Sequence, residues 1–558
     1  MPTIKNLAER LTGASGPYLM AAEPEVELKF LVAERDFAKV ESLLAAAAPG
    51  RERSVQRLRA VYFDTPKHDL WKRGFILRVR AANGGYVQTV KRPASSSIRR
   101  EEWEDRITGP EPDLKRLKNT PLARLARKPS FGASLRPVFE VNVDRTLYNV
   151  ETQSGQVEAA LDQGSIFANG AALGISELEL ELKKGLPSGM YDLARRFVSR
   201  APLFLNPISK AERGYLLGRG EWGRPAKGSR PRLRKDMTSR EAFQEICRAC
   251  LHDFHLNAAD LESCEDIEAV HQSRVAIRRL RAAMTLFKPL VFDPSYRRFQ
   301  GELRWLAGLL GAARDLDVLQ QNLPRLSFNQ GSAGGKAAPA AAIAGECEAK
   351  RLQARQAIME ALESERGRAF LLDFALWIED GRWQALAAPA AKTLIAKFAR
   401  AKLKKRLTKL TQKGADLEKL SPPARHEIRI EAKKLRYMAE FFAGLPGVAR
   451  ERKNFKALIN LCEKLQESLG AMRDEEAFAA YLHNQRAETN GGWSTSGKTG
   501  PLPAGEGTQP GAAEGAAHRT GPESVSGLPS FPQWKPGKTK HLQKAVRAYA
   551  KLAALQPF

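Results

Sequence analysis

The sequence predicts an α+β chain in two parts: an N-terminal antiparallel β-barrel that encloses a tunnel, then an all-α helical bundle with an internal two-fold repeat. Three observations support this fold class. Apolar residues recur at every second position from about residue 23 to 219 and follow a helical period from about 236 to 486. Several predicted strands carry like charges on one face. Two helical segments, residues 271–287 and 426–442, align without a gap.

The length of 558 residues is too great for a single core, so we expect several segments. We place the boundaries of these segments where the composition changes, and the linker and tail are rich in Gly and Pro. We predict an N-terminal segment (1–22), a tunnel domain (23–219), a basic linker (220–235), a helical domain (236–486), a low-complexity segment of disordered composition (487–540) and a C-terminal basic helix (541–558).

The net charge of +27 favours a polyanionic partner, which leaves nucleic acid, anionic lipid and phosphate chains as classes. Nucleic acid is the weaker choice, because aromatic residues are not interleaved with the basic stripes. Five cysteines without a paired pattern indicate a reducing compartment. We find neither an apolar leader nor a membrane-spanning run, so we expect a cytoplasmic protein.

The strand patterns of the first part place like charges side by side. In residues 25–30 (EVELKF), Glu25, Glu27 and Lys29 share one face and apolar residues share the other. The same alternation holds for Arg57 and Arg59, for Arg78 and Arg80, for Glu140, Asn142 and Asp144, and for Glu177, Glu179, Glu181 and Lys183. Like charges on one face repel unless an opposite charge lies between them. The economical arrangement is a closed barrel with these charges inside.

The two kinds of charge select different ligands. A guanidinium matches the geometry of phosphate or carboxylate, whereas a set of carboxylates matches a hard cation with oxygen ligands. Arginines and carboxylates in one cavity therefore suggest a complex of a metal ion with a phosphate chain.

The residues also resemble the CYTH domains, or triphosphate tunnel metalloenzymes. The matches follow one another in family order and cover about residues 23–219, and they look most like the bacterial inorganic triphosphatases. They are the ExExK start at 25–29, VYFDTP (61–66), FILRVR (75–80), TVKRP (89–93), VNVDR (141–145), ALDQG (160–164), SELELEL (176–182) and SKAERGY (209–215).

This resemblance implies roles for individual residues. Glu25, Glu27, Lys29 and Glu179 would be catalytic, and Mg²⁺ or Mn²⁺ would be the cofactor. The implied metal ligands are Glu25, Glu27, Asp162, Glu177 and Glu179. Glu181 also faces inward and is a weaker candidate. The implied phosphate-binding residues are Lys29, Arg57, Arg59, Arg78, Arg80, Lys91, Arg145, Lys183, Lys210 and Arg213.

The second part contains its own internal evidence for a repeat. The aligned segments place basic residues at offsets that fall within about 80° of a helix, so each set forms one stripe. The stripes are His271, Arg274, Arg278 and Arg281, and His426, Arg429, Lys433 and Arg436. The similarity continues downstream, where residues 309–319 pair with 468–478. Two related halves with basic stripes suggest a pseudo-twofold bundle with a basic groove.

This half resembles the CHAD domain, a helical domain that binds inorganic polyphosphate and is often fused to CYTH. The resemblance implies that the eight residues of the two stripes contact phosphate. We find no set of nucleophile, base and orienting residue in this half, so we interpret it as a binding domain.

Together, these interpretations predict a metal-dependent enzyme that hydrolyses inorganic triphosphate, with a helical domain that binds inorganic polyphosphate. Two alternatives stay open. The tunnel would instead act on an organic triphosphate, by hydrolysing thiamine triphosphate or cyclising ATP, although no pocket for a base or for thiamine is evident. Alternatively, the whole protein would be a non-catalytic polyphosphate-binding or granule-associated module.

Overall fold

The computed structural model describes residues 25–50, 53–82, 84–93, 99–259, 261, 267–322, 337–385, 392–445, 454–472 and 538–555. The chain divides into two compact units. The first, here called the sheet unit, comprises Met1–Gly223 with Glu365–Glu379, and the second, the helical unit, comprises Arg224–Ser364 with Asp380–Phe558. The predicted segment 1–22 and most of the predicted segment 487–540 lie outside the described residues.

The sheet unit contains nine named strands and several short helices. Its strands are β1 (Glu25–Val32), β2 (Ser54–Asp64), β3 (Ile76–Ala82), β4 (Gly85–Pro93), β5 (Arg99–Ile107), β6 (Arg136–Thr152), β7 (Gly155–Ala168), β8 (Ala171–Gly185) and β9 (Leu203–Leu205). Its helices are α1 (Phe37–Ala47), α2 (Asp69–Lys72), α3 (Ala123–Ala126), α4 (Pro129–Ser134), α5 (Pro187–Arg200) and α6 (Lys210–Gly218), and α12 (Glu365–Asp380) joins them from later in the chain.

All pairings in this sheet are antiparallel, in the order β5-β4-β3-β2-β6-β7-β8-β1-β9. The register aligns the charged positions of neighbouring strands, since Glu27 on β1 lies opposite Glu181 on β8, which lies opposite Glu158 on β7. Strand β1 also pairs with β5 over two residue pairs, Glu25 with Arg100 and Val26 with Arg99. This short contact links β5, at one end of the strand order, to β1, which is next to last, and the predicted closed barrel is not confirmed.

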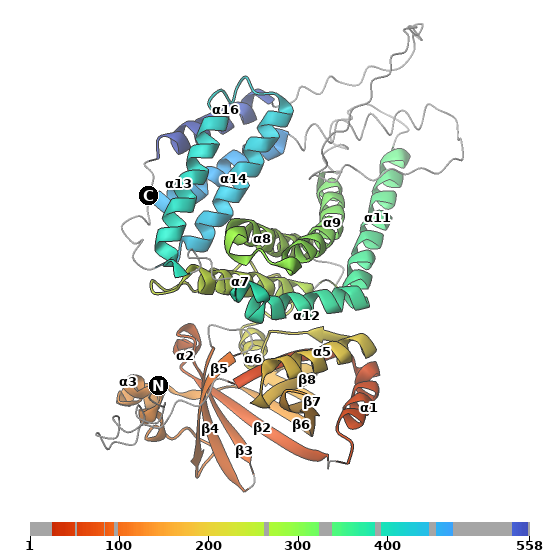
Figure 1. Cartoon of the computed structure of the whole chain (residues 1–558), viewed down its shortest axis with the longest axis vertical. Coiled ribbons are helices and arrows are strands. Elements are labelled where there is room, and N and C mark those ends of the chain that lie inside the picture. The colour runs from red at the N-terminus through yellow and green to blue at the C-terminus, as the bar shows by residue number, and fades with distance from the viewer. Residues whose placement is uncertain are drawn as a thin grey trace, which may run out of the picture. The chain divides into compact units, whose positions relative to one another are not determined.

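The apolar face of the strands explains where the core lies. Leu28 and Phe30 of β1 and Leu178 and Leu180 of β8 are almost fully buried in one cluster, because alternation sends them all to the same face. Helices α1 and α5 pack on this part of the sheet (Figure 1). The opposite face of β1 and β8 carries Glu27, Lys29, Glu177, Glu179, Glu181 and Lys183.

Helix α12 adds a contribution to this core from far along the sequence. Its Leu372 and Leu376 belong to the same buried cluster as Leu28 and Phe30. Two polar contacts join α12 to α5: Arg195 donates to Asp373 at 2.8 Å, and Arg368 donates to the Val198 carbonyl at 3.4 Å. The sheet unit thus includes a helix whose sequence position lies within the predicted helical domain.

The helical unit is built from long helices. They are α7 (Ser239–Ala258), α8 (Ile267–Val291), α9 (Pro294–Asn322), α11 (Ala337–Glu363), α13 (Ile395–Lys413), α14 (Pro422–Phe442) and α16 (Lys538–Ala553), and residues 454–472 are also helical. Local sequence fixes several starts. At α7, the Thr238 hydroxyl accepts from the Glu241 amide and the Glu241 carboxylate accepts from the Thr238 amide, which is a capping box. At α14, Ser421 is the cap, and two prolines occupy the first turn.

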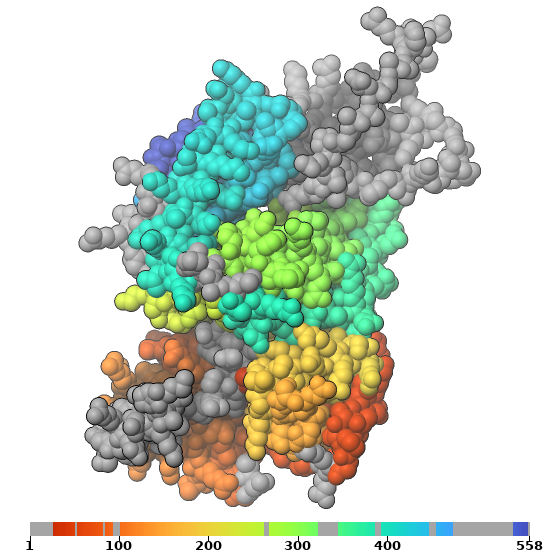
Figure 2. Space-filling view, viewed as in Figure 1, coloured from red at the N-terminus to blue at the C-terminus, as the bar shows by residue number. Residues whose placement is uncertain are grey.

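Helix α8 is central to this unit and contacts α7, α9 and α14. Its buried residues include Ile277, Leu280 and Phe287. Helices α13 and α14 lie side by side, and their cyan surfaces adjoin in Figure 2. Among the described residues, no helix is long and apolar enough to cross a membrane.

The predicted order, an antiparallel sheet followed by a helical region, is confirmed. The predicted basic linker contains neither helix nor strand from residue 220 to 235. The predicted C-terminal helix begins at Lys538, three residues earlier than expected from the sequence.

The position of α12 leads to a stability prediction. Leu372→Ala should lower the free energy of unfolding of the sheet unit by about 2–5 kcal/mol, because it removes a side chain that is 1% exposed in a packed core. Leu352→Ala on α11 is the matched control, since Leu352 is 44% exposed. Denaturant unfolding followed by circular dichroism measures both. Equal transition midpoints for the two variants would show that α12 adds little to this core.

Candidate active site and anion-binding pocket

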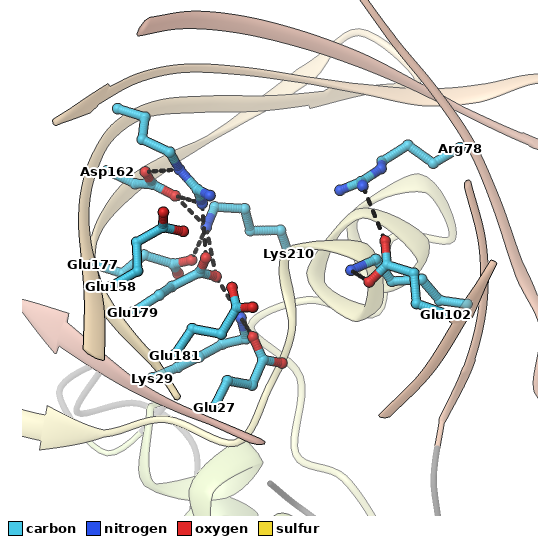
Figure 3. Close-up of polar contacts among 12 residues, drawn as sticks. Glu27, Lys29, Arg78, Glu102, Glu158, Asp162, Glu177, Glu179, Glu181 and Lys210 are labelled. Atoms are coloured by element: carbon cyan, nitrogen blue, oxygen red, sulfur yellow. Dashed lines mark hydrogen bonds and ion pairs between the residues drawn. The ribbon is translucent and has the colours of Figure 1, made fainter. Parts of the chain in front are cut away.

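The charged face of the sheet lines a cavity of about 260 Å³. Figure 3 shows acidic residues of β1, β7 and β8 gathered on one wall, with Lys29 and Lys210 among them, while Arg78 and Glu102 lie on the opposite wall. The lining is formed by Glu27, Lys29, Leu58, Ala60, Tyr62, Ile76, Arg78, Arg80, Lys91, Glu102, Glu104, Val141, Val143, Arg145, Glu158, Glu179, Glu181, Lys183, Ser209, Lys210 and Ala211.

Three carboxylates form the centre of the acidic wall. Asp162 of β7 and Glu177 and Glu179 of β8 each place an oxygen within 4.8 Å of the others. Asp162 and Glu177 are fully buried. The β7–β8 register explains the cluster, because Asp162 lies directly opposite Glu177 and Glu179 is two residues further along the same face.

Four cations contact these carboxylates. Arg145 makes two hydrogen bonds to Asp162, at 2.7 and 2.6 Å, and one to Glu179 at 2.7 Å. Lys210 pairs with Asp162 at 2.7 Å and Glu179 at 3.0 Å, and also with Glu177. Arg213 pairs with Glu177, and Lys29 pairs with Glu179 and with Glu27 at 2.7 Å. The network joins residues from β1, β6, β7, β8 and α6.

Neighbouring charges, more than burial, set the pKa of Glu179 and of Lys210. Burial raises the pKa of Glu179, but Lys210, Lys29 and Arg145 outweigh it and hold that pKa well below its ordinary value. Burial lowers the pKa of Lys210, and the three carboxylates reverse this effect and raise it. Both side chains are therefore charged at neutral pH.

The donor set of the acidic wall fits a hard divalent cation. Asp162, Glu177 and Glu179 offer only carboxylate oxygens, as Mg²⁺ and Mn²⁺ require. Glu27 lies beside them, tied to the cluster through Lys29. The backbone of Glu25 is described, but its side chain lies outside the described residues.

The opposite wall holds residues that the motif analysis missed. Arg78 donates to Glu102 at 3.4 Å, and Lys91 donates to Glu102 at 2.5 Å. Glu104 pairs with Arg78 and with Arg80, at 3.5 and 3.9 Å. Strand β5 is charged on both faces, so alternation gave no sign that Glu102 and Glu104 face the cavity. Burial, followed by Arg78, lowers the pKa of Arg80.

A third missed residue could have been found from the sequence. Glu158 precedes Asp162 by four positions, which places both on one face of β7. It contacts Lys183 at 3.1 Å, and Lys183 also contacts Glu181 at 2.7 Å. Lys183 and Glu181 lie in the cavity as expected.

Three predicted phosphate-binding residues do not line the cavity. One of them, Arg213, is buried and pairs with Glu177. Arg57 and Arg59 point away from the cavity, because Leu58, Ala60 and Tyr62 occupy the cavity face of β2. Their side chains are 88% and 68% exposed and pair with Asp144 and Glu140 of β6. The arginines of β2 and the carboxylates of β6 thus neutralise each other across neighbouring strands, on the other face of the sheet.

The helical unit contains a second pocket, of about 140 Å³, with a different character. Three predicted residues line it: Arg278 and Arg281 of α8 and Lys433 of α14. Further polar residues line it as well, among them Gln300, Arg304, Arg406 and Lys434. Arg304 and Arg406 belong to α9 and α13, so only the packing of these helices against α8 and α14 reveals them.

The other stripe residues lie along the same two helices. Burial and the charge of Arg314 lower the pKa of His271, and burial and Arg278 lower the pKa of Arg274. Arg436 contacts Glu440 and Glu463 at 3.4 and 3.3 Å, and its counterpart in the first stripe, Arg281, lines the pocket. His426 and Arg429 are half-buried on α14.

One contact recurs in both aligned segments. Arg274 lies near Gly311, at 3.8 Å from the position that a Cβ would occupy, and Arg429 lies near Gly470, at 3.1 Å from the equivalent position. Arg274 aligns with Arg429, and Gly311 aligns with Gly470. A glycine therefore leaves room for a stripe arginine in each segment.

Comparison with known families agrees with this geometry. The CYTH domain family matches residues 23–215, and the CHAD domain family matches residues 245–483. The chain contains a CYTH domain followed by a CHAD domain. The resemblances drawn from the sequence motifs are thus confirmed, and the charged cavity lies in the CYTH domain.

Individual relatives match parts of the chain. An inorganic triphosphatase of Haemophilus influenzae is 30% identical over 198 residues, which is 35% of this chain and 55% of that protein. The uncharacterized protein MT2285 of Mycobacterium tuberculosis is 28% identical over 319 residues, which is 54% of this chain and 59% of that protein. The chain thus spans little more than half the length of these curated relatives. The crystal structure of the CHAD domain from the plant Ricinus communis is 28% identical, with a TM-score of 0.40, and the match covers 48% of this chain and 87% of that one.

The network around Glu179 predicts a dependence of stability on pH. Because the pKa of Glu179 is lower in the folded state than its ordinary value of 4.5, its contribution is fully present above about pH 4.5 and is lost as the pH falls below that value. Each unit of pKa difference is worth about 1.4 kcal/mol. The sheet unit of Glu179→Gln should therefore lose less stability on acidification than that of the wild type.

Denaturant unfolding at several pH values from 7 down to about 3 measures this difference. Glu111→Gln is the control, since Glu111 is exposed. Parallel pH profiles for the wild type and Glu179→Gln would contradict the role assigned to Glu179.

Proposed function

We propose that the CYTH domain hydrolyses inorganic triphosphate with Mg²⁺ or Mn²⁺, and that the CHAD domain binds inorganic polyphosphate. Similarity to an inorganic triphosphatase over the CYTH region supports a hydrolase of the triphosphatase type. One structural observation carries the proposal: cations line both walls of a cavity, and Glu179, which also lines it, belongs to a cluster of three carboxylates. A metal-bound phosphate chain is the ligand whose charges match both sets.

In this proposal the charged cavity is a tunnel that the strands enclose only in part. The short pairing of β1 with β5 contributes to the enclosure, because it links β5, at one end of the strand order, to β1, next to last in that order. A triphosphate inside would lie between Arg78, Arg80 and Lys91 on one wall and Arg145 and Lys210 on the other. These cations would hold the substrate and neutralise charge at the reacting phosphorus, which is the main requirement of phosphoryl transfer.

The carboxylates would hold the metal. Glu27, Asp162, Glu177 and Glu179 offer suitable oxygens, and Glu25 is an expected fifth ligand from the motif. A bound divalent ion would supply charge neutralisation on the phosphate oxygens and lower the pKa of bound water. Water would attack the terminal phosphorus and the bond to its bridging oxygen would break, giving orthophosphate and pyrophosphate. Glu158 or Glu181 would accept the proton from the attacking water, since both line the cavity.

The pocket of the helical unit supports the second half of the proposal. Arg278, Arg281, Arg304, Arg406 and Lys433 converge on it from four helices. The side chains that line this pocket are cations, neutral polar groups and apolar groups, and two of the cations, Arg406 and Lys434, pair with Glu431 at 2.6 and 3.5 Å. An excess of positive charge around a cavity attracts a polyanion.

The proposed polyphosphate-binding residues are the eight stripe residues of α8 and α14. The recurrent contacts of Arg274 with Gly311 and of Arg429 with Gly470 support a two-fold relation between the two segments. Four cysteines of the described residues, Cys247, Cys250, Cys347 and Cys462, are buried free thiols, which supports the expected cytoplasmic location.

The first test concerns catalysis. Glu27→Gln and Glu179→Gln should each lower kcat/KM for triphosphate roughly a thousandfold. Each substitution removes either a metal ligand or a charge that positions a metal ligand. Phosphate release from triphosphate, pyrophosphate and ATP, with and without Mg²⁺ or Mn²⁺, measures both rate and specificity. We expect triphosphate to be the best substrate. Near wild-type rates in both variants, or a higher kcat/KM for ATP, would contradict the proposal.

The second test concerns binding to the helical unit in the full-length chain. Reversing Arg278 and Lys433 to Glu should greatly weaken polyphosphate binding, because both line the pocket. Reversing Lys544 and Arg547, which are exposed on α16, is the control. Binding of the wild type should also fall steeply with salt as counterions are released. Duplex DNA should compete poorly at physiological salt, and equal competition would indicate general binding of polyanions.

A further inference from the structure

Asp64 is a fully buried carboxylate with no place in the proposed reaction. It ends β2 and accepts hydrogen bonds from four donors. The amides of Thr65 and Leu70 donate to Oδ1 at 2.7 and 2.9 Å, and the Trp71 amide donates to Oδ2 at 3.0 Å. The fourth donor is the hydroxyl of Tyr215, at 2.9 Å from Oδ2. Removing a carboxylate from water is costly, so such complete pairing marks a constrained position.

The Tyr215 bond ties α6 to the end of β2. Tyr215 is 1% exposed, and its ring stacks on Trp71 at 4.5 Å between centroids. Its edge meets Phe139 of β6 at 5.1 Å. Burial, with Asp64 beside it, raises the pKa of the Tyr215 hydroxyl, which therefore stays a donor throughout the physiological range.

The neighbouring glycine sets how closely α6 approaches the sheet. A Cβ on Gly214 would lie 2.3 Å from two ring atoms of Phe139, a distance that no relaxed contact allows. The Phe139 ring has little freedom to move aside, since it is 4% exposed and stacks on Tyr62 at 4.3 Å. Tyr62 in turn lines the cavity. Glycine at position 214 is thus a requirement of packing.

The same helix carries two cations of the acidic wall. Lys210, Arg213 and Gly214 are spaced i, i+3 and i+4, so they lie on one side of α6. The Lys210 ammonium contacts Asp162, Glu177 and Glu179 together, and Arg213 contacts Glu177. A movement of α6 relative to β6 would shift both cations away from all three carboxylates.

We propose that Asp64, Phe139, Gly214 and Tyr215 form an α6 seat, a positioning device that sets how deeply Lys210 enters the cavity and how closely Arg213 approaches Glu177. The residues of the seat are positioning residues: they act on the substrate through Lys210 and on the metal through the three carboxylates. This inference rests on the proposed triphosphatase function for its kinetic consequence. It gives a role to the buried aspartate of the VYFDTP segment and to the Gly-Tyr pair that ends SKAERGY.

The test compares two glycines of the same helix. Gly214→Ala places a methyl group against Phe139, whereas Gly218→Ala makes only an ordinary contact, 3.5 Å from the Ala168 Cβ. Gly214→Ala should lower kcat for triphosphate roughly a hundredfold, as expected for a misplaced reacting group. KM should change much less, because Arg78, Arg80 and Lys91 still bind the substrate. Gly218→Ala should retain wild-type kinetics.

A second readout separates positioning from a general loss of folded protein. Withdrawal of Lys210 leaves the carboxylates less neutralised, so the half-saturating Mn²⁺ concentration of Gly214→Ala should fall several-fold. Partial unfolding would lower the apparent kcat and leave this concentration unchanged. Adding Phe139→Leu to Gly214→Ala removes ring atoms that the methyl group strikes and should restore much of kcat.

Tyr215→Phe tests the seat without a steric clash, and it carries the test if Gly214→Ala does not fold. Like Gly214→Ala, the Tyr215→Phe variant should have a lower kcat and a lower half-saturating Mn²⁺ concentration than the wild type. Wild-type kcat and Mn²⁺ dependence in a folded Gly214→Ala, or in Tyr215→Phe when it is the only folded variant, would overturn the seat.

If the wild type and Gly218→Ala also fail to hydrolyse triphosphate, the proposed function is wrong. Crystal structures of the wild type and of Gly214→Ala, or Tyr215→Phe, then decide the inference: a Lys210 ammonium moved away from Glu177 supports the seat, and an unmoved one overturns it.

Discussion

The structure of the sheet unit depends on the neutralisation of three buried carboxylates by four cations. Asp162, Glu177 and Glu179 cannot stay ionised in a buried cluster without compensation, and Lys210 touches all three. The cations and carboxylates of the network together come from five different elements, so the network holds those elements in register. The interactions that a phosphate chain and a metal would use are thus already made within the protein, between its own cations and carboxylates.

The need for charge balance also explains the remaining polar contacts of this unit. On the far wall, Glu102 bridges Arg78 and Lys91, and on the outer face Arg57 and Arg59 pair with Asp144 and Glu140. The strands hold the buried ion pairs in place. Exposed ion pairs such as Arg57–Asp144 contribute little to stability, because water screens them. The same residue types therefore serve in a cavity on one face of the sheet and as surface pairs on the other.

The helical unit treats charge in another way. Its pocket gathers Arg278, Arg281, Arg304 and Lys433 over apolar side chains such as Leu286 and Phe441. Here packing forces supply the stability, since the long helices bury extended apolar stripes, and the cations gather at the pocket. A cavity that balances its charges suits a metal-bound anion, and a pocket with excess positive charge suits an anion alone.

The sequence by itself determined the strand and helix periods, the order of an antiparallel sheet before a helical region, and the acidic faces of β1 and β8. These are properties of local alternation, because the two-residue period of a strand assigns each side chain to a face. Which face points into the cavity was decided only by tertiary pairing: Arg57 and Arg59 alternate in the same way as Arg78 and Arg80, yet the β2–β6 register turns them outward. Glu102, Glu104, Arg304 and Arg406 reach their sites through packing between distant segments, which no local pattern records. The inclusion of α12 in the sheet core, through Leu372 and Leu376, likewise follows from long-range contacts between apolar surfaces, whose partners no local pattern in α12 identifies.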